Sequence, residues 1–209
     1  MDSREFPADS IGKVFARRMP YFLHEGGAAL ASRYPVLDHK YVRFADTNND
    51  YLRADLLVGG DTVRLFAVHL QTSGIAQLRR RFRKDYNRDA PVERILGELE
   101  HNSSIRAGQV GEIRVEIDAS PYPVILAGDF NESNMSSEMM VKLKEKWEII
   151  STSSNTFMNT ATPKRIDYIV LYKGNKAACE VLGTAVPSYD EINVNKVSDH
   201  PPVLVDIKK

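Results

Sequence analysis

The stretch YPVILAGDFN, residues 122–131, gives the strongest structural signal in this sequence. The apolar run Tyr122–Ala127 is bounded by proline and glycine, which is typical of a buried strand. Asp129 and Asn131 follow two positions apart, so on an extended chain both side chains point the same way, while Phe130 points into the core. A carboxylate beside an amide can orient or deprotonate a water and donate to a phosphate oxygen. Taken alone, an ordinary turn is at least as good an interpretation, because Gly, Asp and Asn are common turn residues.

Strand patterns continue on both sides of this stretch. A run of small residues, Gly26–Ala31, predicts a buried strand that ends at Pro35, because a residue before proline is disfavoured in helix. A meander of strands is expected next, with polar turns at 48–50 and 59–61. The strands expected in the meander and after residue 131 are Tyr41–Thr47, Tyr51–Val58, Val63–Leu70, Ile166–Leu171, Val181–Val186 and Val203–Ile207.

Helical spacing dominates residues 75–118. The apolar residues with this spacing are Val92, Ile95, Leu96, Leu99, Val110, Ile113 and Ile117. The polar run 102–104 is expected to kink or interrupt the helix. Short helices are expected around Ile11–Arg18 and along Met140, Leu143 and Trp147. Strands with helical insertions predict an α/β sandwich of two packed sheets with outer helices, in one domain covering residues 1–209.

The composition narrows the function classes. The chain has 28 basic and 28 acidic residues, whereas a dedicated nucleic-acid coat protein is strongly basic. The single cysteine, Cys179, excludes an internal disulfide framework and a cysteine-rich zinc site. No apolar run approaches the roughly 20 residues of a membrane span, and we expect no transmembrane segment. An enzyme that meets one phosphate in a local pocket remains compatible with these numbers.

Asp199 and His200 stand directly before an apolar strand, at a rim position where functional groups gather. Asp199 can hold a hard cation through oxygen, and His200 can contact a phosphate or move a proton. The alternative is a surface pair without a function, because an isolated histidine is more often structural than catalytic.

Two further polar residues interrupt apolar strands. Asp167 needs a partner there, since burial of an unpaired carboxylate is costly. The partner is either a histidine such as His200, whose tautomer it would fix and whose pKa it would raise, or a salt bridge to Arg165 or Lys164. His69, at the end of its strand, is either a buried histidine bonded to backbone or a second histidine facing a phosphate.

Together and in this order, these residues resemble the endonuclease/exonuclease/phosphatase family, which includes deoxyribonuclease I-like enzymes. The resemblance spans roughly residues 26–207. The matching motifs are Gly27–Pro35 (GAALASRYP), Val68–Leu70 (VHL), Gly128–Asn131 (GDFN), Arg165–Ile169 (RIDYI) and Ser198–Val203 (SDHPPV). The resemblance implies a deoxyribonuclease I-like four-layer sandwich of two mostly antiparallel sheets with outer helices.

The resemblance also implies the site and its chemistry. The residues implied to be catalytic are His69, Asp129, Asn131, Asp167 and His200. The residues implied to hold the metal are Asp199, Asp129 and Asn131. The implied reaction is in-line attack of water on a phosphoester, assisted by Mg²⁺ or Mn²⁺. The implied substrate is nucleic acid, a phospholipid or a small phosphate ester.

The chain departs from the family pattern at its start. The family opens with a strand carrying an asparagine and a second strand ending in Gln-Glu, whose glutamate is the principal metal ligand, and neither stands before Gly26 here. We therefore expect an N-terminally truncated domain with its first strands missing, weak metal binding and impaired activity in this chain. We expect a homodimer partner, a neighbouring copy or residues 1–25 to cover the exposed sheet. The compartment stays open, with the cytoplasm as the default.

A second hypothesis is a catalytically impaired phosphate-binding module of the same fold. The missing glutamate favours it for this chain, whereas the presence of the other site residues opposes it for a longer parent protein. The arginine-rich stretch 79–88 can touch a nucleic-acid backbone or an anionic membrane, but the acidic residues that follow favour a solvated helix face.

Overall fold

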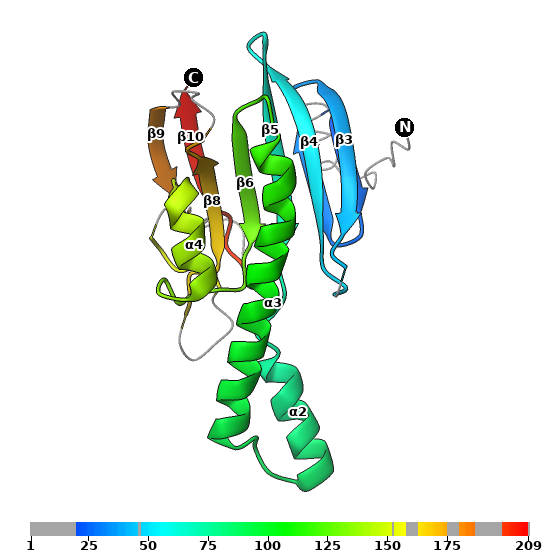
Figure 1. Cartoon of the computed structure of the whole chain (residues 1–209), viewed down its shortest axis with the longest axis vertical. Helices are drawn as coiled ribbons and strands as arrows, with labels where there is room; N and C mark the ends of the chain where they lie inside the picture. Colours follow the sequence, from blue (N-terminus) through cyan, green and yellow to red (C-terminus); the bar gives the residue numbers. More distant parts are fainter. Residues whose placement is uncertain are drawn as a thin grey trace.

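A six-stranded sheet forms the centre of the molecule (Figure 1). The computed structural model describes residues 20–45, 47–151, 153–157, 163–174, 180–186 and 198–208. The strands lie in the order β3-β4-β5-β6-β8-β7; β5 and β6 are parallel and the other pairs antiparallel. Their bounds are Val36–Arg43 (β3), Asp50–Val58 (β4), Asp61–His69 (β5), Val124–Asp129 (β6), Trp147–Ile149 (β7) and Asp167–Tyr172 (β8).

Helices cover one face of this sheet. Parallel neighbours need a long crossover, and here it consists of α2 (Ile75–Tyr86) and α3 (Val92–Asp118), which connect β5 to β6. Figure 1 shows α3 lying along the sheet and continuing, together with α2, past its end. A third helix, α4 (Glu138–Lys146), also packs on this face. The larger hydrophobic core, between helices and sheet, includes Phe66, Val68, Ile113, Ile117, Leu126, Phe130, Met140, Leu143 and Tyr168.

The opposite face of β4 and β5 is covered by a hairpin. Strands β1 (Tyr21–Glu25) and β2 (Ala28–Ser32) pair with each other and form a second core with the sheet. This second core contains Ala28, Leu30, Leu52, Ala54 and Leu56. A further antiparallel pair consists of β9 (Glu180–Ala185) and β10 (Leu204–Lys208). In the described part of the chain, the predicted second sheet therefore takes the form of two separate two-stranded sheets.

The predicted meander is confirmed as β3-β4-β5, although β3 begins at Val36, earlier than expected. The predicted buried strand at 26–31 is β2, but Ala29 on it is exposed, so only one of its faces is buried. The strands expected after residue 131 are confirmed as β8, β9 and β10 with boundary shifts. The helix expected at 11–18 lies outside the described residues.

The expected break of the long helix at residues 102–104 is wrong, because α3 runs unbroken from Val92 to Asp118. Polar side chains there bond to the helix backbone without disrupting it. The Asn102 amide donates to the Glu98 carbonyl oxygen at 2.8 Å, and the Ser104 hydroxyl donates to the His101 carbonyl oxygen at 2.7 Å.

Gly128 allows β5 and β6 to pair closely where both strands end. Its φ angle is 144°, in the region that favours glycine. A Cβ atom at this position would overlap the carbonyl oxygen of Val68, the residue paired with Gly128 in the neighbouring strand. Glycine here therefore lets His69 and Asp129, one position further along each strand, lie side by side.

Candidate active site

Four titratable residues occupy one row across the sheet. Strand pairing places Asp50 opposite His69, His69 opposite Asp129, and Asp129 opposite Asp167. Paired residues on adjacent strands direct their side chains to the same face. In the neighbouring row, the side chains of Tyr51, Val68 and Tyr168 lie in the core between sheet and helices. The row of four therefore faces away from the helices, toward the side on which the β1–β2 hairpin packs.

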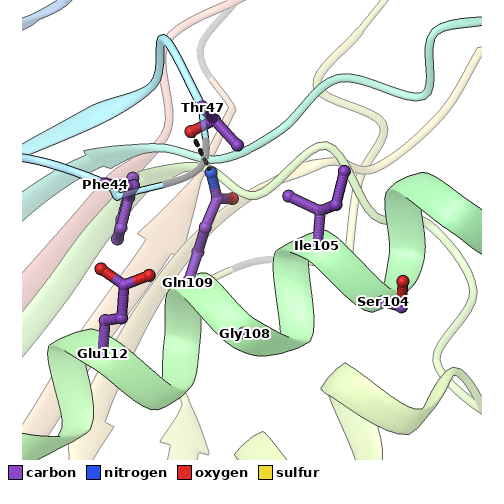
Figure 2. A pocket seen from close by; sticks show the side chains of 7 residues that line it. All are labelled: Phe44, Thr47, Ser104, Ile105, Gly108, Gln109 and Glu112. Carbon is purple, nitrogen blue, oxygen red and sulfur yellow. Dashed lines mark hydrogen bonds between the residues drawn. The ribbon is translucent and has the colours of Figure 1, made fainter.

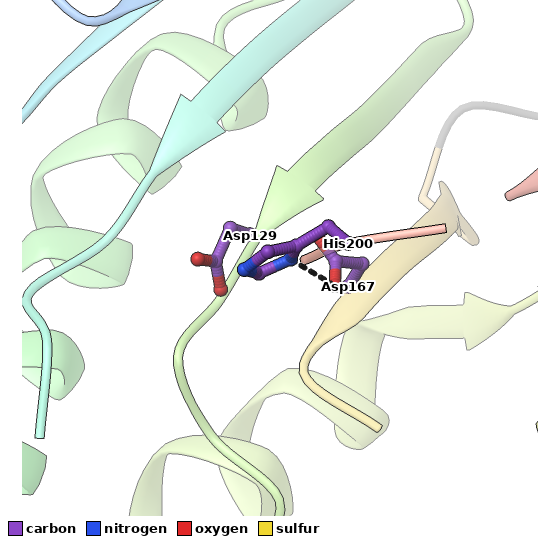
Figure 3. Close-up of side chains that lie close together, drawn as sticks. All are labelled: Asp129, Asp167 and His200. Carbon is purple, nitrogen blue, oxygen red and sulfur yellow. Dashed lines mark hydrogen bonds and ion pairs between the residues drawn. The ribbon is translucent and has the colours of Figure 1, made fainter. Parts of the chain in front are cut away.

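His200 joins this row from the segment that precedes β10. Its Nδ1 atom lies 2.9 Å from the Asp167 carboxylate, which confirms the partner predicted for both residues. Figure 3 shows the His200 ring between the Asp167 and Asp129 carboxylates. The hydrogen bond to Asp167 is the main cause that raises the pKa of His200, and the charges of Asp167, Asp129 and Asp199 add to it against the opposing effect of burial.

The side chain of Thr156 holds the backbone at Asp167 in place. The hydroxyl of Thr156 accepts hydrogen bonds from the backbone N–H groups of Ile166 at 3.0 Å and Asp167 at 2.9 Å, which sets the start of β8. Among the described residues, Asp167 forms its ion pair with His200 and not with Arg165 or Lys164, the alternative partners. The Arg165 guanidinium instead donates to the Ser151 carbonyl oxygen at 3.0 Å.

Asp129 and Asn131 interact directly. The Asn131 backbone N–H donates to Asp129 Oδ1 at 2.7 Å, and its side-chain nitrogen donates to Asp129 Oδ2 at 3.1 Å and to the Leu70 carbonyl oxygen at 3.0 Å. The expected extended conformation is wrong at Asn131, whose φ angle is 51°. This turn still brings the two side chains together and buries Phe130 completely, as predicted.

These bonds decide which atoms of the pair stay available. Both amide hydrogens of Asn131 have acceptors, so its Oδ1 atom is left to contact a ligand. Burial raises the pKa of Asp129, and the charge of Asp167 adds to this effect against the backbone hydrogen bond from Asn131. A carboxylate with a raised pKa is a better proton acceptor near neutral pH than an ordinary aspartate.

His69 and Asp199 lie at the edge of the group. The Nε2 atom of His69 is 3.7 Å from Asp129 Oδ2, and 44% of the His69 side chain is exposed, so His69 is not the buried backbone-bonded histidine of the alternative. Asp199 is exposed, and its carboxylate lies near enough to His200 to raise the pKa of the imidazole. The tight group among described residues is Asp129, Asp167 and His200, with one potential metal-binding atom of each within 4.8 Å of the others.

Asp50 is a member of the row that the sequence patterns missed. It is 4% exposed, and its Oδ2 atom accepts from the Gly27 N–H at 2.8 Å and the Tyr41 hydroxyl at 2.7 Å. Its Oδ1 atom has no hydrogen-bond partner in the described part of the chain. The sequence places Asp50 in a polar turn, and only the register of β4 against β5 reveals its position opposite His69.

The model of the Endonuclease/Exonuclease/phosphatase family matches residues 4–200. This chain belongs to that family. Members of the endonuclease/exonuclease/phosphatase family hydrolyse phosphoester bonds, and the family residues recognised in the sequence are the ones gathered in and beside the row. No curated protein sequence matches the chain.

Solved structures show the same deoxyribonuclease I-like fold. Sphingomyelinase C from Streptomyces griseocarneus is 19% identical with a TM-score of 0.61, over 94% of this chain and 82% of that protein. Humanized D. rerio TDP2 is 17% identical with a TM-score of 0.66, over 94% of this chain and 80% of that protein. A variant of beta toxin from Staphylococcus aureus with bound magnesium ions is 20% identical with a TM-score of 0.56, over 86% of this chain and 67% of that protein.

Among the described residues, no helix combines the length and the apolar character needed to cross a bilayer. The homodimer expected to cover the sheet stays a prediction.

Proposed function

We propose that this protein is a metal-dependent phosphoesterase that hydrolyses a phosphodiester or phosphomonoester by in-line attack of water. The observation that carries the proposal is the group formed by Asp129, Asp167 and His200, with one potential ligand atom of each within 4.8 Å of the others. His69 extends the group along the same row. Two carboxylates and two imidazoles on one face provide a base, a proton donor and contacts for an anionic substrate.

His200 acts as the proton donor and phosphate contact. Its Nδ1 atom donates to Asp167, so its Nε2 atom is directed toward the substrate side, near Asp129. The raised pKa keeps the imidazole protonated at higher pH than usual. A protonated imidazole stabilises negative charge on a phosphoryl oxygen and can donate its proton to the oxygen that leaves.

Asp129 acts as the water-orienting base. A bond forms between the water oxygen and phosphorus, the bond from phosphorus to the leaving oxygen breaks, and the water proton passes to Asp129. The raised pKa of Asp129 suits it for this transfer. His69 lies beside Asp129 and contacts a second phosphoryl oxygen.

The oxygen atoms of this site suit a hard divalent cation such as Mg²⁺ or Mn²⁺. Asp129 offers a carboxylate, Asn131 offers its Oδ1 atom, because its side-chain nitrogen makes the two donor contacts, and Asp199 offers a second carboxylate beside His200. The bound cation would neutralise charge on the phosphoryl oxygens.

The catalytically impaired binding module is not favoured by this geometry. A module that only captured phosphate would need cationic or amide donors, whereas this group contains two adjacent carboxylates and a histidine paired with one of them. Adjacent carboxylates repel an anion unless a cation or a proton lies between them. The arrangement therefore fits a hydrolase better than an anion receptor.

The test is a hydrolysis screen of the purified chain with Mg²⁺ or Mn²⁺. The substrates are bis(p-nitrophenyl) phosphate, p-nitrophenyl phosphate, single-stranded DNA and vesicles containing sphingomyelin or phosphatidylcholine, which separate the three substrate classes. We expect metal-dependent turnover that His200→Gln abolishes and Lys142→Gln leaves intact, because Lys142 forms an exposed ion pair with Glu138 on α4. Phosphate binding without turnover would support the binding module instead.

A further inference from the structure

A buried polar stripe runs along α3. Asn102, Arg106 and Gln109 are spaced by four and three residues, which places them on one side of the helix. Each is at most 3% exposed. Buried polar side chains need partners, and these three find theirs in the loops that follow the site strands.

All three side chains bind one residue, Gln71, which follows His69 by two positions. The Gln71 backbone N–H donates to Gln109 Oε1 at 2.8 Å, and its side-chain amide donates to Asn102 Oδ1 at 2.8 Å. Its carbonyl oxygen accepts from Arg106 Nη1 at 3.1 Å. The backbone and side chain of Gln71 are thus fixed by three successive contacts from one helix.

Gln109 links this stripe to a third segment. Its side-chain nitrogen donates to the Thr47 hydroxyl at 3.0 Å, across a pocket that Phe44, Ile105 and Glu112 help to line (Figure 2). The β3–β4 turn, the end of β5 and α3 therefore meet at Gln109.

Arg106 also reaches the second site loop. Its Nη2 atom donates to Glu132 Oε2 at 2.9 Å, and Glu132 directly follows Asn131. Glu132 is 6% exposed, and its carbonyl oxygen accepts from the buried Tyr168 hydroxyl at 2.9 Å. One guanidinium therefore joins the loop after His69 to the loop after Asp129.

The buried ion pair of Arg106 and Glu132 is better explained by positioning of the loops than by a gain in stability. The attraction within a buried ion pair often does not exceed the free energy lost when both charges leave water. Replacing the pair with apolar side chains of similar volume often leaves the protein equally stable or more stable. Arg106 and Glu132 are 2% and 8% exposed at their side chains. The planar guanidinium with its fixed set of donors can, in contrast, hold two acceptors at a defined separation, which an apolar pair cannot do.

We propose that Arg106 is a positioning residue: by bridging Gln71 and Glu132 it holds the loop after His69 against the loop after the Asp129–Asn131 turn, beyond the point where the β5–β6 pairing ends. The inference rests on the proposed function, since it assigns Arg106 to the hydrolysis carried out at that site. Arg106 acts through the loops and does not touch the reacting atoms.

The test compares the single variant Arg106→Met, the double variant Arg106→Met/Glu132→Leu and the control Arg114→Gln, which alters an exposed ion pair on the same helix. Arg106→Met should lower Tm because it leaves the Glu132 charge buried without its partner. The double variant should regain most of the Tm that Arg106→Met loses. Its kcat should stay about 10²-fold below that of the unaltered protein, with KM changed much less, because a small misplacement of reacting groups costs turnover. A kcat that returns together with Tm in the double variant would overturn the proposal.

A second measurement does not depend on turnover. The imidazole ¹H–¹⁵N signals of the five histidines can be followed by NMR in each variant. The His69 signals should shift in the double variant and those of His200 should not, because Asp167 holds His200 independently of Arg106. Unchanged His69 signals overturn the proposal even if the enzyme is active. If the His69 signals shift in the double variant but the unaltered protein hydrolyses none of the substrates, Arg106 still positions the loops and the proposed function is wrong.

Discussion

The Nδ1 atom of His200 lies 2.9 Å from the carboxylate of Asp167, although 33 residues separate the two in sequence. Asp167 begins β8, and His200 precedes β10, so the pair joins the large sheet to the segment that leads into the small β9–β10 sheet. The contact with Asp167 fixes the Nδ1 atom of the imidazole, and the Nε2 atom remains available to exchange a proton with the substrate.

Replacing Asp167 with asparagine should lower turnover far more than stability. The amide keeps the shape of the side chain but no longer holds the imidazole in the same tautomer or stabilises its charge. We expect kcat to fall by at least about 10²-fold, the usual scale for acid–base catalysis. Steady-state kinetics beside circular-dichroism melting will measure both effects. Equal losses of turnover and folded protein would contradict the role given to Asp167.

The same pair should make stability depend on pH. A raised folded-state pKa of His200 stabilises the fold below the unfolded histidine value of about 6.5, and this contribution is lost as pH rises through the folded value. Asp167→Asn should therefore lower the free energy of unfolding more at pH 6 than at pH 8.5. Urea titrations at the two pH values measure the difference. In a His200→Gln background the pH dependence of the Asp167→Asn effect should vanish.

Asp129→Asn should stabilise the protein at neutral pH while removing activity. Burial raises the pKa of Asp129, so this carboxyl favours folding when protonated and opposes it once pH rises through the unfolded and folded values. Asparagine keeps an oxygen that accepts the Asn131 N–H but carries no charge. We expect a higher free energy of unfolding at pH 7, a gain that shrinks toward pH 4, with kcat at least about 10²-fold lower. A loss of stability at pH 7 would show that the charge is compensated in the free protein.

Metal binding by this chain should be weak. A hard cation held by one or two carboxylates keeps most of its waters, and the candidate ligands here are the buried Asp129, the neighbouring Asn131 and the exposed Asp199. Calorimetric titration with Mn²⁺ should give a Kd of the order of 1 mM or weaker, and Asp129→Asn should weaken it further. A Kd in the low micromolar range would mean that another acidic side chain completes the ligand set.

Local patterns were enough to predict most of the strands. The apolar run before Gly128 becomes β6, and His200 is one of the two kinds of partner that the sequence left open for Asp167. These features depend on residue types at fixed spacings, which a sequence displays directly. The grouping of Asp129 with His200 could be expected because each lies beside a strand end.

Other features could not be read from local patterns. Asn102 looked like a helix breaker, but its amide hydrogens bond to Glu98 and its oxygen accepts from Gln71, which lies 31 residues away. Asp50 looked like a turn residue until strand register placed it opposite His69. Both cases depend on which segments pack together, and neither periodicity nor charge spacing carries that information.

Gly128, and the parallel pairing it permits, has a consequence for how the protein refolds. His69 and Asp129 become neighbours only when β5 and β6 pair, and 60 residues of chain, including all of α3, must be folded back to allow this. Contacts between such distant segments form slowly, because the chain must lose the conformational entropy of the connecting loop before the contacts can stabilise the fold. We therefore expect the hairpins to appear early after dilution from denaturant and hydrolytic activity to return with the slowest phase. The recovery of activity would then measure the rate at which β5 and β6 pair.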